Sequence, residues 1–184
     1  VDRVHPATRS VIEGGAVPQG WTPRLSPQVT PIAETYGPYG APVAVAGGDD
    51  PWQRIECTGS LDCVADQEYE LRLTLRAGSA GGFRASARAA GAAVVEIISD
   101  GVFSPVLTTD SGASVYGLEV HDEGGGIHVV RLLFSLPSPV TVTFDVGPGA
   151  CAPGEDVVVF GAAVCPWPYP ATGWQPGMKP IRFT

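Results

Sequence analysis

Hydrophobic and polar residues alternate with a period of two along much of the chain, which is typical of β-strands with one buried face. The clearest run covers residues 67–76, where Tyr69, Leu71, Leu73 and Leu75 share one face. Further runs lie at 82–89, 128–136 and 140–146, and less regular ones at 28–33, 41–46, 52–57, 93–98, 102–108, 114–120 and 156–164. The pattern therefore predicts about eight to eleven short strands.

Glycine and proline interrupt nearly every window of a dozen residues, so no stretch predicts a helix. The 184 residues include 24 Gly and 18 Pro, and turn signals such as 47–50, 81–82 and 124–126 separate the predicted strands. Short strands at a spacing of roughly ten residues indicate an antiparallel sandwich or barrel. We expect an all-β fold in two layers.

The two ends of the chain are rich in proline and lack sustained alternation. Proline cannot donate to a β-ladder, so we expect these segments to be extended. The predicted organisation is an N-terminal arm at 1–27, a β-sandwich at 28–165 and a Pro- and aromatic-rich C-terminal arm at 166–184. The arms are expected to lie over the body or reach a neighbour, and the alternative for the first arm is a disordered terminus.

The chain is acidic, with 19 Asp and Glu against 11 Lys and Arg and a net charge of −8. A protein without a basic run cannot displace phosphate counterions efficiently, which argues against nucleic acid as a partner. No apolar stretch approaches the ~20 residues of a membrane span, so we expect no membrane insertion. The first residues also lack the layout of a signal peptide.

Sequence patterns of common catalytic sites are missing: the chain has no Gly-x-Ser-x-Gly and no His-Glu-x-x-His. His121 and His128 flank a predicted glycine turn, and a hairpin there would allow a metal site with Asp122 or Glu123. The alternative, a solvated hairpin tip, is favoured. We expect a binding or structural protein and no enzyme.

Two acidic pairs are candidates for a structural calcium site, because this hard cation prefers many oxygen ligands. Asp49 and Asp50 follow two glycines, and Glu155 and Asp156 precede the last predicted strand. The alternative is turn chemistry, in which each carboxylate accepts hydrogen bonds from nearby backbone N–H groups. No other cofactor is expected.

Four cysteines allow three complete disulfide pairings. Cys57 and Cys63 bracket a short turn-rich segment, so a local bridge between them is predicted. Cys151 and Cys165 flank the predicted strand 156–164 and would lie roughly 30 Å apart, whereas a disulfide needs Cα atoms within about 7 Å. Either that strand bends, or Cys165 meets Cys57 or Cys63, or the second pair stays reduced.

Several segments together resemble a known family of phage structural domains. The closing strand 154–164 (GEDVVVFGAAV) has a glycine, alternating apolar residues and an aromatic followed by Gly-Ala, and a Pro- and aromatic-containing tail follows it. Two further strands of the family are matched by segments 67–78 and 127–134. The short motifs that open the family's sequence are resembled by 20–22, 29–31 and 40–42, and the motif that closes it by 179–184. Over about residues 20–184 the chain resembles the jelly-roll, carbohydrate-binding-module-like domain of phage tail and head-fibre proteins.

This resemblance implies a jelly-roll sandwich that serves as a phage-type virion surface component, a tail or head fibre or decoration protein. Such a component assembles in the host cytoplasm, is then extracellular, and adheres to host-surface glycan. The implied partners are other capsid or tail proteins and a glycan, with many copies or a homo-oligomer acting through avidity. Val164-Cys165 and His128-Val129 depart from the family pattern, which commonly has an apolar-Glu pair and an aromatic before the Arg.

Aromatic residues are the expected contacts in this interpretation, because flat rings stack on the apolar faces of pyranose sugars. Tyr36, Tyr39 and Trp52 are the predicted ligand-binding set. Trp21, Trp167, Tyr169 and Trp174 are predicted to anchor the chain to other subunits or to the particle, with sugar stacking as the alternative for the tail residues.

Two other functions remain open from the sequence. The first is a purely structural capsid or tail decoration protein that binds no sugar. The second is an accessory carbohydrate-binding module, or a degenerate hydrolase, of a secreted bacterial protein.

Overall fold

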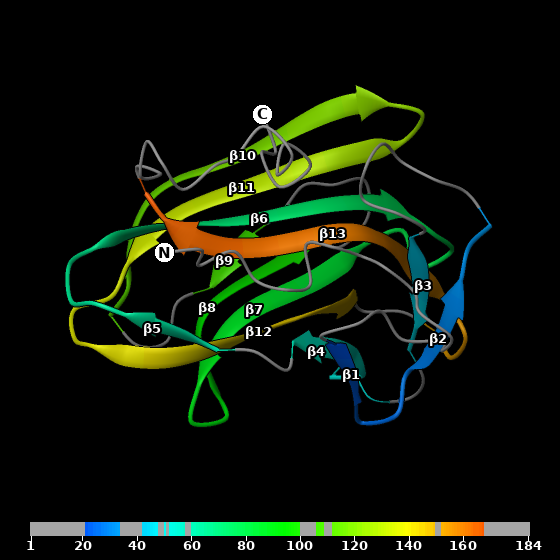
Figure 1. The fold of residues 1–184 in the computed structure, drawn as a ribbon. Helices are drawn as coiled ribbons and strands as arrows, with labels where there is room; N and C mark the ends of the chain where they lie inside the picture. The colour runs from blue at the N-terminus through cyan, green and yellow to red at the C-terminus, as the bar shows by residue number, and fades with distance from the viewer. Residues whose placement is uncertain are drawn as a thin grey trace.

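The computed structural model describes residues 21–33, 42–47, 50, 52–57, 60–99, 106–108, 112–149 and 152–167, and the structural statements below concern these residues. In this part of the chain the regular elements are all β-strands, and none of it is helical. Two antiparallel sheets pack face to face (Figure 1), and the chain crosses between them repeatedly. The predicted all-β jelly-roll sandwich is confirmed.

The seven-stranded sheet has the order β1-β4-β12-β7-β8-β9, and β5 also pairs with β12. Its strands are β1 (Trp21–Arg24), β4 (Arg54–Cys57), β5 (Leu61–Cys63), β7 (Phe83–Ala89), β8 (Ala92–Ser99), β9 (Val106–Thr108) and β12 (Val140–Pro148). The six-stranded sheet has the order β10-β11-β6-β13-β3-β2. Its strands are β2 (Gln28–Pro31), β3 (Val43–Ala46), β6 (Glu68–Ala77), β10 (Ser114–Gly124), β11 (Ile127–Ser135) and β13 (Asp156–Pro166).

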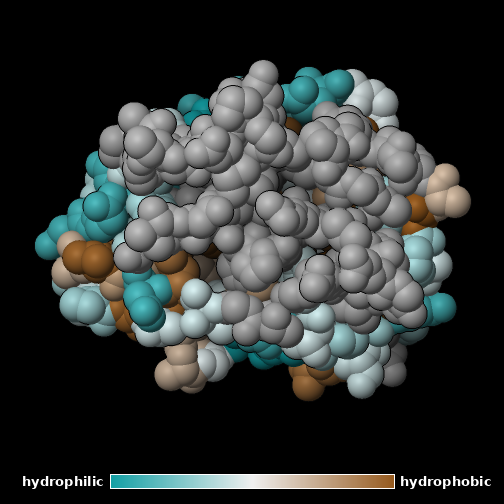
Figure 2. Space-filling view, in the orientation of Figure 1, coloured by the Kyte–Doolittle hydropathy of each residue, from teal (hydrophilic) through white to brown (hydrophobic). Residues whose placement is uncertain are grey.

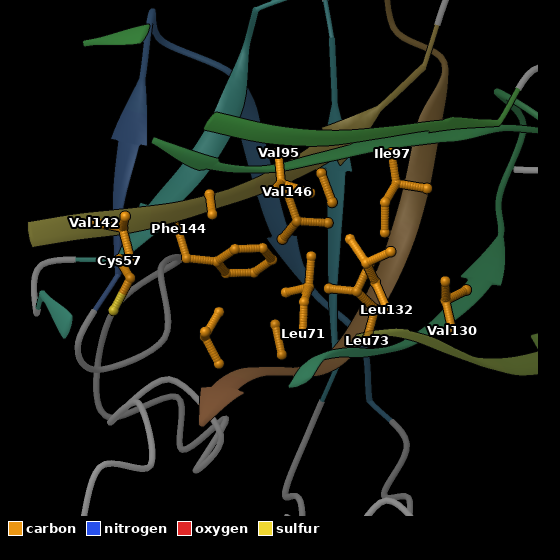
Figure 3. Close-up of a cluster of buried hydrophobic side chains, with 14 of the residues drawn as sticks. Cys57, Leu71, Leu73, Val95, Ile97, Val130, Leu132, Val142, Phe144 and Val146 are labelled. Atoms are coloured by element: carbon orange, nitrogen blue, oxygen red, sulfur yellow. The ribbon is translucent and has the colours of Figure 1, made fainter. Parts of the chain in front are cut away.

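The core lies between the sheets and is built from the inward-facing half of each alternating strand. Tyr69, Leu71, Leu73 and Leu75 of β6 are all buried, as the alternation predicted. In Figure 3, Leu71 and Leu73 of one sheet lie opposite Val95, Ile97 and Val146 of the other. The run 157–160 is buried on both faces: Val157 and Val159 belong to the core, and the outward-facing Val158 and Phe160 are only 4% and 1% exposed.

The body begins earlier in the chain than the sequence predicted. Trp21 belongs to β1, pairs with Cys57 of β4 and is only 7% exposed. Its indole meets the ring of Phe144 edge-on at 6.1 Å between centroids. Trp21 therefore fills the core of its own sandwich, which leaves little of this side chain for the predicted anchoring contact.

The described surface carries few large exposed hydrophobic side chains, namely Leu25, Val64 and Tyr116. In Figure 2 the hydrophobic residues that are coloured on this face are separated by hydrophilic ones. None of the described residues form a helix that would serve as a membrane span.

The predicted bridge between Cys57 and Cys63 is not formed. The two residues lie on β4 and β5, which both run antiparallel to β12, and both thiols are buried. Glu56 is level with Asp145 and Cys63 is level with Val140, so several residues of β12 separate the two cysteines. At ~3.3 Å per residue this exceeds the Cα separation of about 7 Å that a disulfide tolerates. Of the other two cysteines, Cys151 and the side chain of Cys165 lie outside the described residues.

Replacement of Gly78 by alanine is expected to destabilise the fold by about 1–3 kcal/mol, through overpacking. A Cβ at Gly78 would lie 2.4 Å from the backbone oxygen of Asp156, so the turn after β6 would have to move away from β13. Thermal or urea unfolding measures the effect. Gly117→Ala is the matched control, because nothing lies within 4 Å of its added Cβ. Equal stability of the two variants would contradict this account of the turn.

Candidate functional site

The outer face of the seven-stranded sheet carries a buried group of charged side chains. Inward-facing residues such as Val146 and Ala85 fill the core, so their neighbours in sequence point to the opposite face. There Asp145 of β12 is level with Glu56 of β4 and with Ser86 of β7. The strands that carry the group are adjacent in Figure 1.

Asp145 and Arg54 form the centre of this group, and both are 0% exposed. The Arg54 guanidinium donates to Asp145 Oδ1 at 2.7 Å and to Glu96 Oε1 at 3.1 Å. Ser86 Oγ donates to Asp145 Oδ1 at 2.6 Å, and Arg24 Nη1 donates to Asp145 Oδ2 at 3.1 Å. One carboxylate therefore ties together β1, β4, β7 and β12.

Gly147 provides the space for the Arg54 side chain. A Cβ at this position would lie 3.0 Å from Arg54 Cγ and 2.9 Å from the backbone oxygen of Gln53. The absence of a side chain on β12 thus allows the guanidinium of Arg54 to cross the sheet toward Asp145 and Glu96.

The indole of Trp52 lies against four guanidinium groups of this face. The distances from its ring centroid to the guanidinium carbons are 4.5 Å for Arg54, 5.2 Å for Arg84, 5.5 Å for Arg88 and 5.8 Å for Arg24. All four lie within the ~6 Å range of cation–π interactions. Trp52 itself is half-buried, so part of its surface remains accessible.

The position of Trp52 is fixed by a turn that begins at Asp50. The backbone N–H of Trp52 donates to Asp50 Oδ1 at 2.8 Å, and the N–H of Gln53 donates to the Asp50 backbone oxygen at 3.1 Å. Asp residues favour such turns because the side chain replaces a backbone acceptor. The turn leads directly into β4.

We call this group the Trp52 site, and its members are Trp52, Arg24, Arg54, Glu56, Arg84, Ser86, Arg88, Glu96 and Asp145. Four arginines against three carboxylates give it a local charge of +1, in a protein whose net charge is −8. Burial lowers the pKa of the Arg88 guanidinium; Asp145 opposes this shift, and the cations Arg24 and Arg54 reinforce it.

The structure brings only some of the predicted site residues together. Trp52, predicted to bind ligand, is at the centre of the site. Tyr36 and Tyr39, predicted with it, lie outside the described residues, as do the predicted anchors Tyr169 and Trp174.

The predicted calcium residues that the structure describes are engaged in turns. Asp50 orients Trp52, and Glu155 Oε2 accepts from the N–H of Ala152 at 2.7 Å. Asp156 Oδ1 accepts from the N–H and the hydroxyl of Ser79, both at 2.8 Å. Among the described residues no group of three or more His, Cys, Asp or Glu is placed to hold a metal ion. Asp49 lies outside the described residues.

The predicted glycine-turn hairpin forms from β10 and β11. His121 is level with Val129, whereas His128 is level with Asp122. Successive positions of a strand point to opposite faces, so the two imidazoles are directed away from each other. The hairpin thus does not assemble the two-histidine metal site that the sequence allowed.

A second charged group lies on the outer face of the six-stranded sheet. Glu70 is buried, and Arg131 donates to both of its carboxylate oxygens at 3.2 Å. The Arg131 guanidinium carbon is also 5.7 Å from the ring centroid of Trp167. The backbone of Trp167 is held by Glu68 and Gln67, so this predicted anchor packs on its own sheet.

Sequence reasoning missed the four arginines and Asp145 as site residues. Polar residues alternate with apolar ones at 84, 86 and 88, and again at 141, 143 and 145. The sequence therefore places each set on the polar face of its strand. The only further signal was the charge of Arg84, Arg88 and Asp145 on strands that are otherwise apolar and rich in small residues.

Comparisons with known proteins agree on the fold. No protein-family model and no curated protein matches the sequence. The structure is similar to an arabinose-bound GH51 α-L-arabinofuranosidase, with a TM-score of 0.53 and 10% identity over 80% of this chain and 23% of that chain. The class that the fold and this comparison define is an antiparallel β-sandwich.

Two weaker similarities were also found. One is to the CBM22-1 xylan-binding domain of Paenibacillus barcinonensis Xyn10C, with a TM-score of 0.47 and 13% identity over 80% of this chain and 86% of that chain. The other is to the enzymatically active domain of tailspike protein 4 of bacteriophage CBA120, with a TM-score of 0.47 and 12% identity over 86% of this chain and 21% of that chain. This chain thus spans less than a quarter of the arabinofuranosidase and tailspike chains.

Proposed function

We propose that this chain is a glycan-binding surface component of a phage-type virion and that it holds its ligand at the Trp52 site. The observation that carries the binding part is a partly exposed tryptophan, Trp52, beside a polar sheet face, with four guanidinium groups within about 6 Å of its ring centre. Sugar sites combine one aromatic face with a few placed polar groups. The Trp52 site supplies both: the polar groups lie on strands of the sheet, and Trp52 lies in the hydrogen-bonded turn that leads into β4.

The particle part of the proposal is supported by the sequence. Residues 67–78 and 154–164 resemble strands of phage tail and head-fibre domains, and proline-rich segments precede and follow the body. In this role the chain acts in many copies beside other virion proteins, so weak binding at each site is sufficient. Binding alone serves this purpose, and the proposal includes no catalytic step.

The experiment compares wild-type protein with Trp52→Ala on an array of host-surface polysaccharides, with the protein presented in many copies. We expect Trp52→Ala to bind about tenfold or more weakly, because the stacking surface is lost. Tyr116→Ala is the control, since this exposed aromatic lies on β10 of the other sheet.

Thermal unfolding of both variants separates a loss of ligand contact from a loss of fold. Equal glycan binding by Trp52→Ala and wild type would contradict the assignment of the site. Failure of wild type to bind any glycan, together with saturable binding to virus particles, would favour a purely structural decoration protein.

A further inference from the structure

We infer that the Trp52 site selects acidic sugars, with the carboxylate of a uronic-acid residue bound by Arg84 while the pyranose ring lies against Trp52. This inference rests on the proposed glycan-binding function and specifies the chemical class of its ligand. Three observations carry it: the hydrogen-bonding state of Arg84, the charge balance of the site, and the distance between the guanidinium and the indole.

Arg84 has hydrogen-bonding capacity that the described structure does not use. Its Nε is buried and has no hydrogen-bond partner, and the nearest carboxylate oxygen, Glu96 Oε1, is 3.8 Å away. That oxygen already accepts a hydrogen bond from Arg54 at 3.1 Å. The side chain of Arg84 is 17% exposed, so a ligand approaches the exposed part of the guanidinium and not the buried Nε.

The other arginines of the site are held by the protein itself. Arg54 donates to Asp145, Ser86 and Glu96, and Arg88 donates to the backbone oxygen of Gly91. Arg24 donates to Asp145. Arg84 is therefore the guanidinium best placed to bind a group from outside.

The charge balance favours an anion over a neutral group. The site has four arginines and three carboxylates. A nearby anion stabilises the charged form of a partly buried cation. A planar carboxylate also matches the two-pronged donor geometry of a guanidinium.

The distances suit a sugar acid rather than a free anion. The Arg84 guanidinium carbon is 5.2 Å from the centre of the Trp52 ring. In a uronic acid the carboxylate is bonded directly to the pyranose ring. In the proposed complex the pyranose packs on the part of Trp52 that the arginines leave exposed and directs its carboxylate toward Arg84.

The test uses a short galacturonate oligosaccharide and the same oligosaccharide with its carboxyl groups reduced to alcohols. Affinities are measured by isothermal titration with the full chain, wild type and variants. We expect wild type to bind the acid form roughly tenfold more tightly than the reduced form, since hydrogen bonds to charged groups are strong.

Arg84→Gln is expected to bind the two forms about equally, because the guanidinium that distinguishes the carboxylate from the alcohol is lost. Arg84→Lys should keep part of the preference, because lysine retains the positive charge but lacks the paired N–H donors of a guanidinium. Arg76→Gln is the control cation; it lies on β6 of the other sheet and should keep the full preference. Thermal unfolding of each variant shows separately that it is folded.

Wild type could bind the acid and the reduced form equally, and Trp52→Ala could bind neither. That result would overturn the acidic preference and leave the proposed function intact. An acid preference that survives Arg84→Gln would overturn the role of Arg84. Binding of polyglutamate as strong as that of the galacturonate would show a general affinity for polyanions and overturn the assignment to a sugar acid. Binding of neither sugar, together with no binding on the polysaccharide array, would overturn both proposals.

Discussion

Replacement of Asp145 by alanine is expected to lower the free energy of unfolding by about 3–5 kcal/mol, the range for a broken buried ion pair. Asp145 is 0% exposed and accepts hydrogen bonds from Arg54, Ser86 and Arg24. Without this carboxylate the buried guanidinium of Arg54 loses its shortest contact in a place where water does not replace it. Urea unfolding of wild type and variant measures the difference.

Asp62→Ala is the matched control for this prediction. Asp62 is exposed on β5 and accepts a hydrogen bond from Thr141 at 2.7 Å. Its replacement should change the stability by about 0.5 kcal/mol or less, as is usual for surface polar pairs. If Asp145→Ala costs no more than Asp62→Ala, the network around Asp145 does not hold the strands together.

Asp145→Asn removes the negative charge of this side chain but keeps its size and shape, so it measures the contribution of the charge to stability. The amide oxygen of asparagine accepts the hydrogen bond of Ser86 as the carboxylate does, but the attraction to Arg54 and Arg24 is reduced. We expect a stability between those of wild type and Asp145→Ala.

Most of the sandwich was predictable because strand alternation is a local property of the sequence. Residues 67–76 alternate along their whole length, and the structure has β6 at Glu68–Ala77. The run 156–164 was predicted as a strand, and the structure has β13 at Asp156–Pro166. For β6 the alternation predicts the core face only: the outward-facing Glu70, Arg72 and Thr74 are buried as well, which the pattern does not show.

Two strands were missed for physical reasons that the structure makes clear. β1 contains Pro23, which led to the prediction of an arm, yet β1 lies at an edge of its sheet and an edge strand tolerates a missing N–H donor. β5 has three residues, too few for alternation to be detected. Proline at an edge and very short strands are both common devices that limit edge-to-edge pairing.

The residues of the candidate site come together through the order and register of the strands. Neither could be predicted from the sequence. The alternation placed Arg84, Ser86 and Arg88 on one face of their strand, as observed. Their partners are distant in the chain: Ser86 meets Asp145 across 59 residues, and Arg54 meets it across 91. Trp52 was predicted to bind ligand from its aromatic character, but its arginine neighbours follow only from the order β1-β4-β12-β7.

Replacement of Trp21 by alanine is expected to destabilise the fold by about 3–5 kcal/mol, as for other large aromatic residues removed from a core. The indole is 7% exposed and packs edge-on against Phe144, so its loss leaves a cavity between β1 and β12. Thr22→Ala is the control, because Thr22 is the next residue of the same strand and is exposed. Chemical unfolding of the two variants gives the comparison.

This experiment also distinguishes the two roles considered for Trp21. A core residue affects the stability of the isolated chain, whereas an anchoring residue affects only the binding of the chain to other subunits or to the particle. A Trp21→Ala variant with wild-type stability but weaker attachment to particles would restore the anchoring role. A large loss of stability in Trp21→Ala, with Thr22→Ala close to wild type, would instead show that β1 is part of the folded body. Trp21 would then be the residue of β1 that completes this edge of the core.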